Sequence, residues 1–148
     1  MNRYKFFILS LTLICVASLS AKDYYATDFG VIADGKTLNT NSIQKGIDFV
    51  NKLGGGRLVF TAGNYLTGSI YLKSNVTLHL EEGATLLGST NPWDYEKDSY
   101  IHWMSMIFAV KQQNIGITGK GTINGRGFQT ANNMVDYIQR GISVSYTH

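Results

Sequence analysis

The sequence predicts an all-β chain that winds short strands into a solenoid, with one amphipathic helix near its start. Its 148 residues include 16 Gly and nine Tyr but a single Pro, a composition typical of short strands joined by tight turns. Two similar short-strand units begin at residues 75 and 114, which indicates stacked coils. The helix is indicated by apolar residues at helical spacing within residues 42–53.

Composition excludes several classes of function. The formal net charge is +3 and no run of Lys or Arg occurs, so a nucleic-acid partner is not expected. A single Cys excludes a disulfide scaffold and a cysteine-built zinc site. Hydrophobic residues make up 44% of the chain, which is enough to form a core and argues against a disordered protein.

The first 20 residues have the pattern of a secretory signal peptide. Arg3 and Lys5 precede an apolar run over residues 6–16, and small residues follow this run. The run is shorter than the ~20 apolar residues of a transmembrane helix, so we expect no stable membrane span. We expect cleavage after Ser20, which leaves residues 21–148 as a secreted or periplasmic chain.

Cys15 offers a second interpretation of the N-terminus, as a lipid-modified residue, but Ile14 before it is a poor match to the small residue expected there. Cleavage after Ser20 removes Cys15, so we expect the mature chain to contain no disulfide. Cleavage also removes two basic residues. The remaining 11 Lys+Arg and 10 Asp+Glu give a formal charge of +1, which does not indicate a partner.

One helix is predicted over residues 42–53, after Asn39 and Thr40, which are natural N-cap residues. The glycines at 54–56 supply the left-handed positions that end a helix. The apolar face of the helix is formed by Ile43, Ile47, Phe49, Val50 and Leu53. No second helix is predicted downstream.

Short strands separated by Gly or Asn turns follow residue 57. We expect them at residues 58–60, 65–72, 75–80 and 84–87. Strands of this length suit a sandwich, a barrel or a solenoid. The units that begin at Asn75 and Asn114 share one order: Asn, apolar, any residue, apolar, a turn, and a second short strand closed by Gly. This repeat favours the solenoid, in which a polar insert at residues 91–99 lengthens the first unit.

Five segments within residues 23–127 form a recognisable set: DFGV (28–31), ADGKT (33–37), GGGRLVF (54–60), LKSNVTLHLEEGATL (72–86) and GKGTINGRG (119–127). The set resembles the N-terminal portion of glycoside hydrolase family 28, the polygalacturonase-like pectin hydrolases. The resemblance implies a right-handed parallel β-helix of the pectate-lyase-like kind, with helix 42–53 capping its N-terminal end. It also implies that residues 21–148 are the N-terminal part of a truncated β-helix domain, whose downstream coils are absent.

The resemblance further implies a secreted glycosidase that hydrolyses O-glycosidic bonds of pectin-type galacturonan by an inverting mechanism with two carboxylates. In the family these carboxylates belong to Asn-x-Asp and Asp-Asp motifs, which Gly-His-Gly and Arg-x-Lys motifs follow. Residues 21–148 contain none of the four motifs. We therefore expect no catalytic residue, cofactor or metal site in this chain, no activity from the chain alone, and a monomeric parent enzyme.

The carboxylates that are present have other expected roles. Asp28 and Asp34 lie in turns, where Asp commonly accepts hydrogen bonds from nearby backbone amides. Asp94, Glu96 and Asp98 alternate as in a calcium loop, but Ser occupies positions 99 and 105, where an EF-hand needs Gly and Glu. We interpret the three acids as a charged loop.

Aromatic residues cluster in and beside the insert: Trp93, Tyr95, Tyr100 and Trp103. Aromatic faces stack on sugar rings, and inserts on a rigid scaffold often bind ligands. Trp93, Tyr95 and Trp103 are therefore candidate substrate-binding residues for a polysaccharide. The alternative is that these side chains pack the insert onto the solenoid.

Two other functions are compatible with the sequence: a non-catalytic carbohydrate-binding or structural β-helix, as in adhesins and tailspikes, and a pectate-lyase-like polysaccharide lyase. Beyond Gly127 no capping element is recognised, and residues 141–148 do not match a further coil. We therefore expect the last coil to expose an apolar face around Ile115, Ile117 and Ile123.

Overall fold

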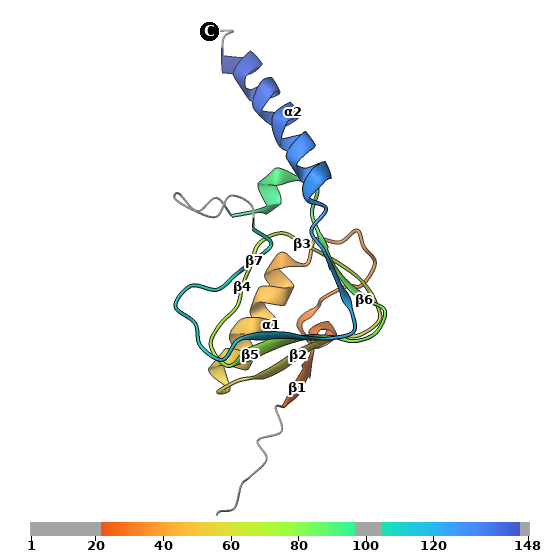
Figure 1. The fold of residues 1–148 in the computed structure, drawn as a ribbon, viewed down its shortest axis with the longest axis vertical. Coiled ribbons are helices and arrows are strands. Elements are labelled where there is room, and N and C mark those ends of the chain that lie inside the picture. Colours follow the sequence, from red (N-terminus) through yellow and green to blue (C-terminus); the bar gives the residue numbers. More distant parts are fainter. Residues whose placement is uncertain (1–21, 97–104, 146–148) are drawn as a thin grey trace, which may run out of the picture.

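The computed structural model describes residues 22–96 and 105–145, which form a right-handed parallel β-helix (Figure 1). Three parallel sheets run along the solenoid, with strand orders β1-β2-β5-β8, β3-β6-β9 and β4-β7. Viewed along the axis, the coils have a roughly triangular outline. The predicted fold class is confirmed.

The elements are short, apart from two helices. The strands are β1 (Asp23–Tyr25), β2 (Gly56–Phe60), β3 (Gly63–Thr67), β4 (Ile70–Tyr71), β5 (Val76–Leu80), β6 (Ala84–Gly88), β7 (Ile107–Phe108), β8 (Gly116–Gly119) and β9 (Thr122–Asn124). The helices are α1 (Thr40–Lys52), α2 (Gly127–Ser145) and the 3-10 turns η1 (Ala26–Phe29) and η2 (Pro92–Asp94). The strand expected at 65–72 is divided between β3 and β4, because the chain bends at Gly68 and Ser69.

The repeat in the sequence corresponds to the stacking register of two successive coils. Strand β5 pairs with β8 so that Ile117 lies beside Leu78, and β6 pairs with β9 so that Ile123 lies beside Leu86. Leu78 and Leu86 are fully buried. Burial alternates along β5 and β6 because successive side chains of a strand point to opposite faces. His79 accordingly faces outward, as its place between two leucines predicts.

Apolar side chains fill the interior of the coils and the space under α1. The largest fully buried ones are Tyr65, Phe60, Ile43, Ile47, Leu58, Ile70, Leu78 and Leu86. Burying a side chain of this size contributes roughly 1.5–3 kcal/mol to folding. The Tyr65 hydroxyl donates to the Thr61 carbonyl oxygen at 2.9 Å, so the polar atom of this residue has a partner.

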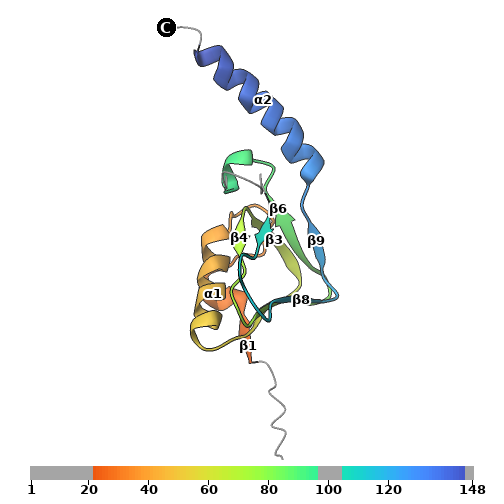
Figure 2. The same ribbon diagram turned by 60° about the vertical axis from the view of Figure 1, so that its left-hand side comes forward.

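Helix α1 closes the N-terminal end of the solenoid, and β8 and β9 lie at the opposite end (Figure 2). Its inward face carries Ile43, Ile47 and Val50, all fully buried. The predicted helix is confirmed, although it begins two residues earlier, at Thr40. Asn39 occupies the N-cap position, but its side chain bonds the backbone of Ile32, in the preceding turn, instead of the helix.

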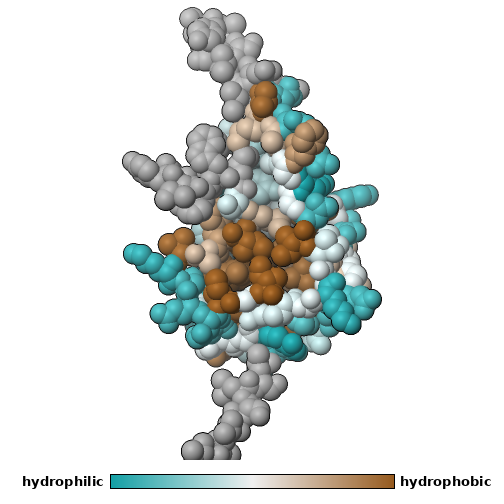
Figure 3. Space-filling model, in the orientation of Figure 1, coloured by the Kyte–Doolittle hydropathy of each residue, from teal (hydrophilic) through white to brown (hydrophobic). Residues whose placement is uncertain are grey.

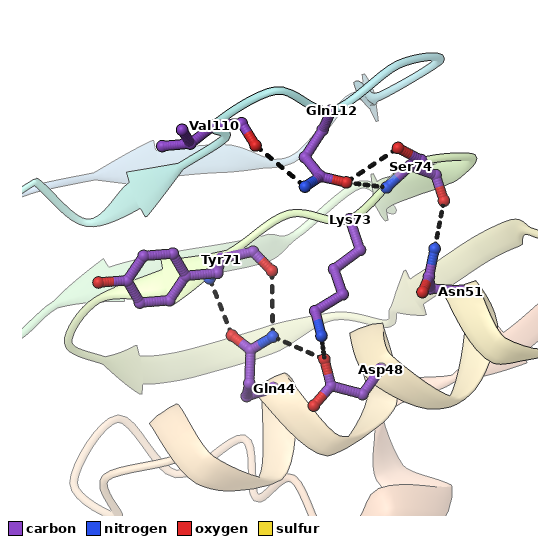
Figure 4. A network of polar contacts seen from close by, with 8 residues as sticks. All are labelled: Gln44, Asp48, Asn51, Tyr71, Lys73, Ser74, Val110 and Gln112. Atoms are coloured by element: carbon purple, nitrogen blue, oxygen red, sulfur yellow. Dashed lines mark hydrogen bonds and ion pairs between the residues drawn. The ribbon is translucent and has the colours of Figure 1, made fainter.

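A polar network ties α1 to β4 and to the segment that follows it (Figure 4). The Gln44 amide oxygen accepts from the Tyr71 backbone nitrogen at 2.8 Å, and its amide nitrogen donates to the Tyr71 carbonyl oxygen at 3.0 Å. Two further contacts join the helix to this segment: Asp48 to Lys73 at 3.1 Å, and the Asn51 amide to the Ser74 carbonyl oxygen at 2.8 Å. The cap is therefore held by polar contacts along its flank as well as by its buried face.

One corner of every coil uses a left-handed backbone conformation. Gly55, Asn75 and Asn114 precede equivalent strand positions and have φ of 120°, 65° and 53°. Gly and Asn adopt positive φ at low cost. The Asn114 side-chain amide donates to the Asn75 side-chain oxygen at 3.0 Å, which links two coils at this corner. A Cβ at position 55 would lie 2.5 Å from the Asn75 carbonyl oxygen, so the first corner requires Gly.

A second helix, α2, was not predicted, and the expectation of a single helix is wrong. The signal was present, because apolar residues recur at 128, 131, 134 and 135. The Thr130 hydroxyl and the Asn133 amide attach the start of α2 to the carbonyl oxygens of residues 89 and 90. Figures 1 and 2 show that the rest of α2 projects away from the solenoid, so it does not cover the last coil. Within the described ranges, no helix is long and apolar enough to cross a membrane.

The last coil leaves an apolar face uncovered, as predicted. Ile115, Ile117 and Ile123 are 37–44% exposed, although Ile117 and Ile123 continue the rows of the buried Leu78 and Leu86. Figure 3 looks onto this end of the solenoid and shows a continuous hydrophobic area at its centre. An uncovered strand edge with apolar neighbours is a site of association.

We predict that residues 21–148 associate through this face at micromolar concentration. Size-exclusion chromatography with light scattering should show dimers or larger species. Because lysine on an edge blocks pairing, the double variant Ile117→Lys/Ile123→Lys should shift the protein toward monomer. Val135→Lys, at an exposed position of α2, is the control and should not change the distribution. A monomeric state of residues 21–148 without substitutions would contradict the prediction.

The corner residues give a stability prediction. Asn75→Ala removes both the tolerance for positive φ and the contact with Asn114, so we expect it to lower the free energy of unfolding by roughly 1–3 kcal/mol. Asn75→Gly keeps the backbone conformation and loses only the side-chain contact, so its loss should be clearly smaller. Urea unfolding followed by circular dichroism compares the two variants. Equal losses of unfolding free energy in the two variants would contradict a contribution of the left-handed backbone at position 75 to stability.

Candidate functional site

The polar insert between β6 and β7 begins with η2 and is described as far as Glu96. Of the residues singled out in this region, Asp98, Tyr100 and Trp103 lie outside the described residues. The described part forms one wall of a pocket of about 400 Å³, whose other wall is the start of α1.

The insert is folded tightly over the bend between β3 and β4. A Cβ on Gly68 would lie 1.7 Å from the Asp94 carbonyl oxygen, so only glycine allows this approach. The Ser69 hydroxyl accepts from the Glu96 backbone nitrogen at 2.9 Å and donates to the Ser105 carbonyl oxygen at 2.8 Å. Gly68 and Ser69 therefore anchor both ends of the insert, a role that the sequence did not indicate.

The Asp94 carboxylate organises the turn of the insert. It accepts hydrogen bonds from the Ser89 hydroxyl and from the Asn91 amide. The Asn91 side-chain oxygen in turn accepts from the Trp93 backbone nitrogen at 3.2 Å. These bonds fit the charged loop that the sequence predicted. Within the described part of the chain, no group of three His, Cys, Asp or Glu residues is placed to hold a metal ion.

The two described aromatic candidates have different surroundings. Tyr95 is only 6% exposed, and its hydroxyl donates to the Ser89 carbonyl oxygen at 2.7 Å. Burial raises the pKa of the Tyr95 hydroxyl. Trp93 is 61% exposed and lines the pocket. Trp93 therefore exposes aromatic surface at the pocket, whereas Tyr95 supports the loop from inside.

The pocket combines apolar, neutral polar and acidic groups. Leu38 and Trp93 supply exposed apolar surface, and Asp94 and Glu96 supply carboxylates. Its neutral polar lining comes from Thr40, Asn41 and Ser69. Among the described residues that line it, there is no Lys, Arg or His. Such a surface can accept hydrogen bonds from hydroxyl groups while an aromatic face covers the apolar side of a ring.

Two other carboxylates, outside the pocket, have structural partners. Asp34 accepts from the backbone nitrogens of Lys36 and Thr37 at 2.8 Å, and these bonds lower the pKa of Asp34 to about 2. The predicted capping role of Asp34 is confirmed. Asp23 forms a two-point contact with the Arg57 guanidinium at 2.6 Å, and the hydrogen bond from Arg57 lowers the pKa of Asp23.

Comparisons with known proteins agree with this architecture, although no protein-family model matches the sequence. The exo-poly-α-D-galacturonosidase of Dickeya chrysanthemi is 39% identical over 128 residues, which cover 76% of this chain and 21% of the relative. The family 28 exopolygalacturonase of Yersinia enterocolitica is 41% identical, with a TM-score of 0.61 over 71% of this chain and 21% of that one.

A protein of Parabacteroides merdae, whose crystal structure is described as that of a candidate glycosyl hydrolase, is 47% identical with a TM-score of 0.75. That match covers 81% of this chain and 51% of the other. The chain spans only about a fifth to a quarter of the length of the curated relatives described as galacturonosidase or polygalacturonase. The chain is therefore similar to the polygalacturonases of glycoside hydrolase family 28, and the part of their length that it covers fits an N-terminal portion.

Proposed function

We propose that this chain is the N-terminal part of a secreted glycosidase that hydrolyses the O-glycosidic bonds of a pectin-type galacturonan. The observation that carries the proposal is the similarity to an exo-poly-α-D-galacturonosidase over 76% of the chain. The N-terminal signal-peptide pattern supports secretion, because a pectin hydrolase meets its polymer outside the cytoplasm.

The proposed reaction is an inverting hydrolysis. A carboxylic acid protonates the leaving oxygen, and a carboxylate on the opposite side of the sugar activates a water molecule. The two groups need a separation of roughly 6.5–9.5 Å to leave room for this water. We propose that both belong to coils downstream of this chain, because residues 21–148 contain no Asn-x-Asp or Asp-Asp motif.

The role proposed for the chain is to start the solenoid on which the catalytic coils are stacked. In its last coil, β8 and β9 present backbone groups and the apolar residues Ile117 and Ile123 in register with the coil before. A further coil would continue these rows. Asp23 and Asp34 are engaged in an ion pair and in a turn, which supports a structural role for both of them.

The proposal is tested first on the chain itself. Residues 21–148 should release no reducing sugar from polygalacturonate above a heat-killed control, because neither the acid nor the base is supplied. Release well above this control would contradict the proposed absence of catalytic residues. The pocket variants Asp94→Asn and Glu96→Gln would then identify the carboxylates responsible.

The gene sequence downstream of codon 148, read in all frames, provides the second test. We expect Asn-x-Asp, Asp-Asp and Gly-His-Gly motifs, and we expect the longer product to release reducing sugar from polygalacturonate. Unsaturated products that absorb in the ultraviolet and disappear with chelator would instead indicate a calcium-dependent lyase. Binding without any cleavage would indicate a structural or adhesive β-helix.

A further inference from the structure

The described lining of the pocket beside the insert can contact both the apolar face and the hydroxyl groups of a sugar ring. Trp93 and Leu38 are 61% and 46% exposed, so the pocket offers apolar surface to the CH face of a ring. Asn41 and Glu96 are exposed beside them and can bond hydroxyl groups. A few polar groups around an aromatic face are the usual composition of a small-molecule site.

The wall that carries Trp93 is held in place before any ligand arrives. Asp94 fits over Gly68, where even a Cβ would collide with its carbonyl oxygen. The Ser89 carbonyl oxygen accepts from the buried Tyr95 hydroxyl at 2.7 Å and from the Thr130 hydroxyl at 3.0 Å. A preorganised wall loses little conformational entropy on binding, which favours recognition by a short loop.

The charge of the pocket discriminates against acidic sugars. Of the described lining residues, Asp94 and Glu96 are charged, and the Asp94 carboxylate accepts from the Ser89 and Asn91 side chains, whose neutrality leaves its charge in place. The N-terminus of α1, at Thr40, contributes about half a positive charge, less than the two negative charges. A galacturonate carboxylate about 7 Å from one of these charges in water would bind roughly threefold more weakly for each of them.

We propose that this pocket is an accessory subsite for an uncharged glycosyl unit, with Trp93 as the stacking surface and Glu96 as a hydroxyl acceptor that repels free carboxylates. The inference rests on the proposed function, since it concerns the same polysaccharide. In pectin an uncharged unit is either a methyl-esterified galacturonate residue or a neutral side-chain sugar. The subsite therefore favours modified regions of the polymer.

The test uses the full chain and three probes: trigalacturonate, its fully methyl-esterified form and β-1,4-galactotriose. Titration calorimetry at low salt should show binding of one or both uncharged probes, with trigalacturonate weaker by roughly threefold to tenfold. The ester and galactotriose arms distinguish the two sources of an uncharged unit. The difference in affinity between trigalacturonate and the uncharged probes should become smaller at 0.5 M salt, because salt screens the carboxylates. Equal or tighter binding of trigalacturonate would overturn the proposal.

Substitutions of Trp93 and Glu96 test separately how aromatic stacking and charge contribute to binding. Trp93→Ala should weaken binding of the preferred uncharged probe by about tenfold, and Trp93→Tyr should recover part of this loss while keeping an aromatic face. Glu96→Gln should improve trigalacturonate binding without improving that of the ester. Phe128→Ala, which removes an aromatic side chain that is 80% exposed on α2, is the control and should have no effect. Wild-type affinity in Trp93→Ala would exclude the pocket as the binding site.

The outcomes distinguish a failure of the subsite proposal from a failure of the hydrolase proposal. If the longer product cleaves polygalacturonate but this chain binds neither uncharged probe, the subsite is wrong and the proposed function stands. If the chain binds an uncharged probe through Trp93 but the longer product cleaves nothing, the hydrolase proposal is wrong and the site is that of a binding protein.

Discussion

The structure depends on the parallel, in-register stacking of successive coils. A side chain that points inward in one coil must lie on the equivalent side chain of the next, as Leu78 does beside Leu58 and Ile117. This arrangement requires every coil to turn at the same corner, since a slip of one residue would send each apolar side chain to the outer face. The left-handed corner at Gly55, Asn75 and Asn114 provides the common turn.

Features governed by local chemistry could be predicted from the sequence. The corner asparagines revealed the repeat because few residues tolerate positive φ, and the helix over residues 42–53 was evident from its apolar spacing. The outward position of His79 followed from the alternation of a strand. Helix α2 was missed, although apolar residues recur at helical spacing at its start.

The candidate site was less accessible to sequence reasoning, because it joins segments that are distant along the chain. Trp93 and Tyr95 lie two residues apart in the same aromatic cluster, yet one is exposed and the other buried, since the turn at η2 directs them differently. The second wall of the pocket, at Leu38 and Asn41, carries no pattern of its own. The importance of Gly68 depends on which backbone packs against it, and composition cannot reveal this.

The contact between Gln44 and Tyr71 has a consequence for how the solenoid can grow. A side-chain amide that accepts from the nitrogen of a strand residue and donates to its carbonyl oxygen imitates a neighbouring strand, so the edge of β4 beneath α1 is already satisfied. In the other two sheets, β2 is covered by the three-residue edge strand β1, and β3 bonds the backbone of residues 33–39. At the opposite end, the described strands β8 and β9 combine an open edge with the exposed apolar residues Ile117 and Ile123. The two ends of the solenoid therefore differ, and the end formed by β8 and β9 is the better template for further coils.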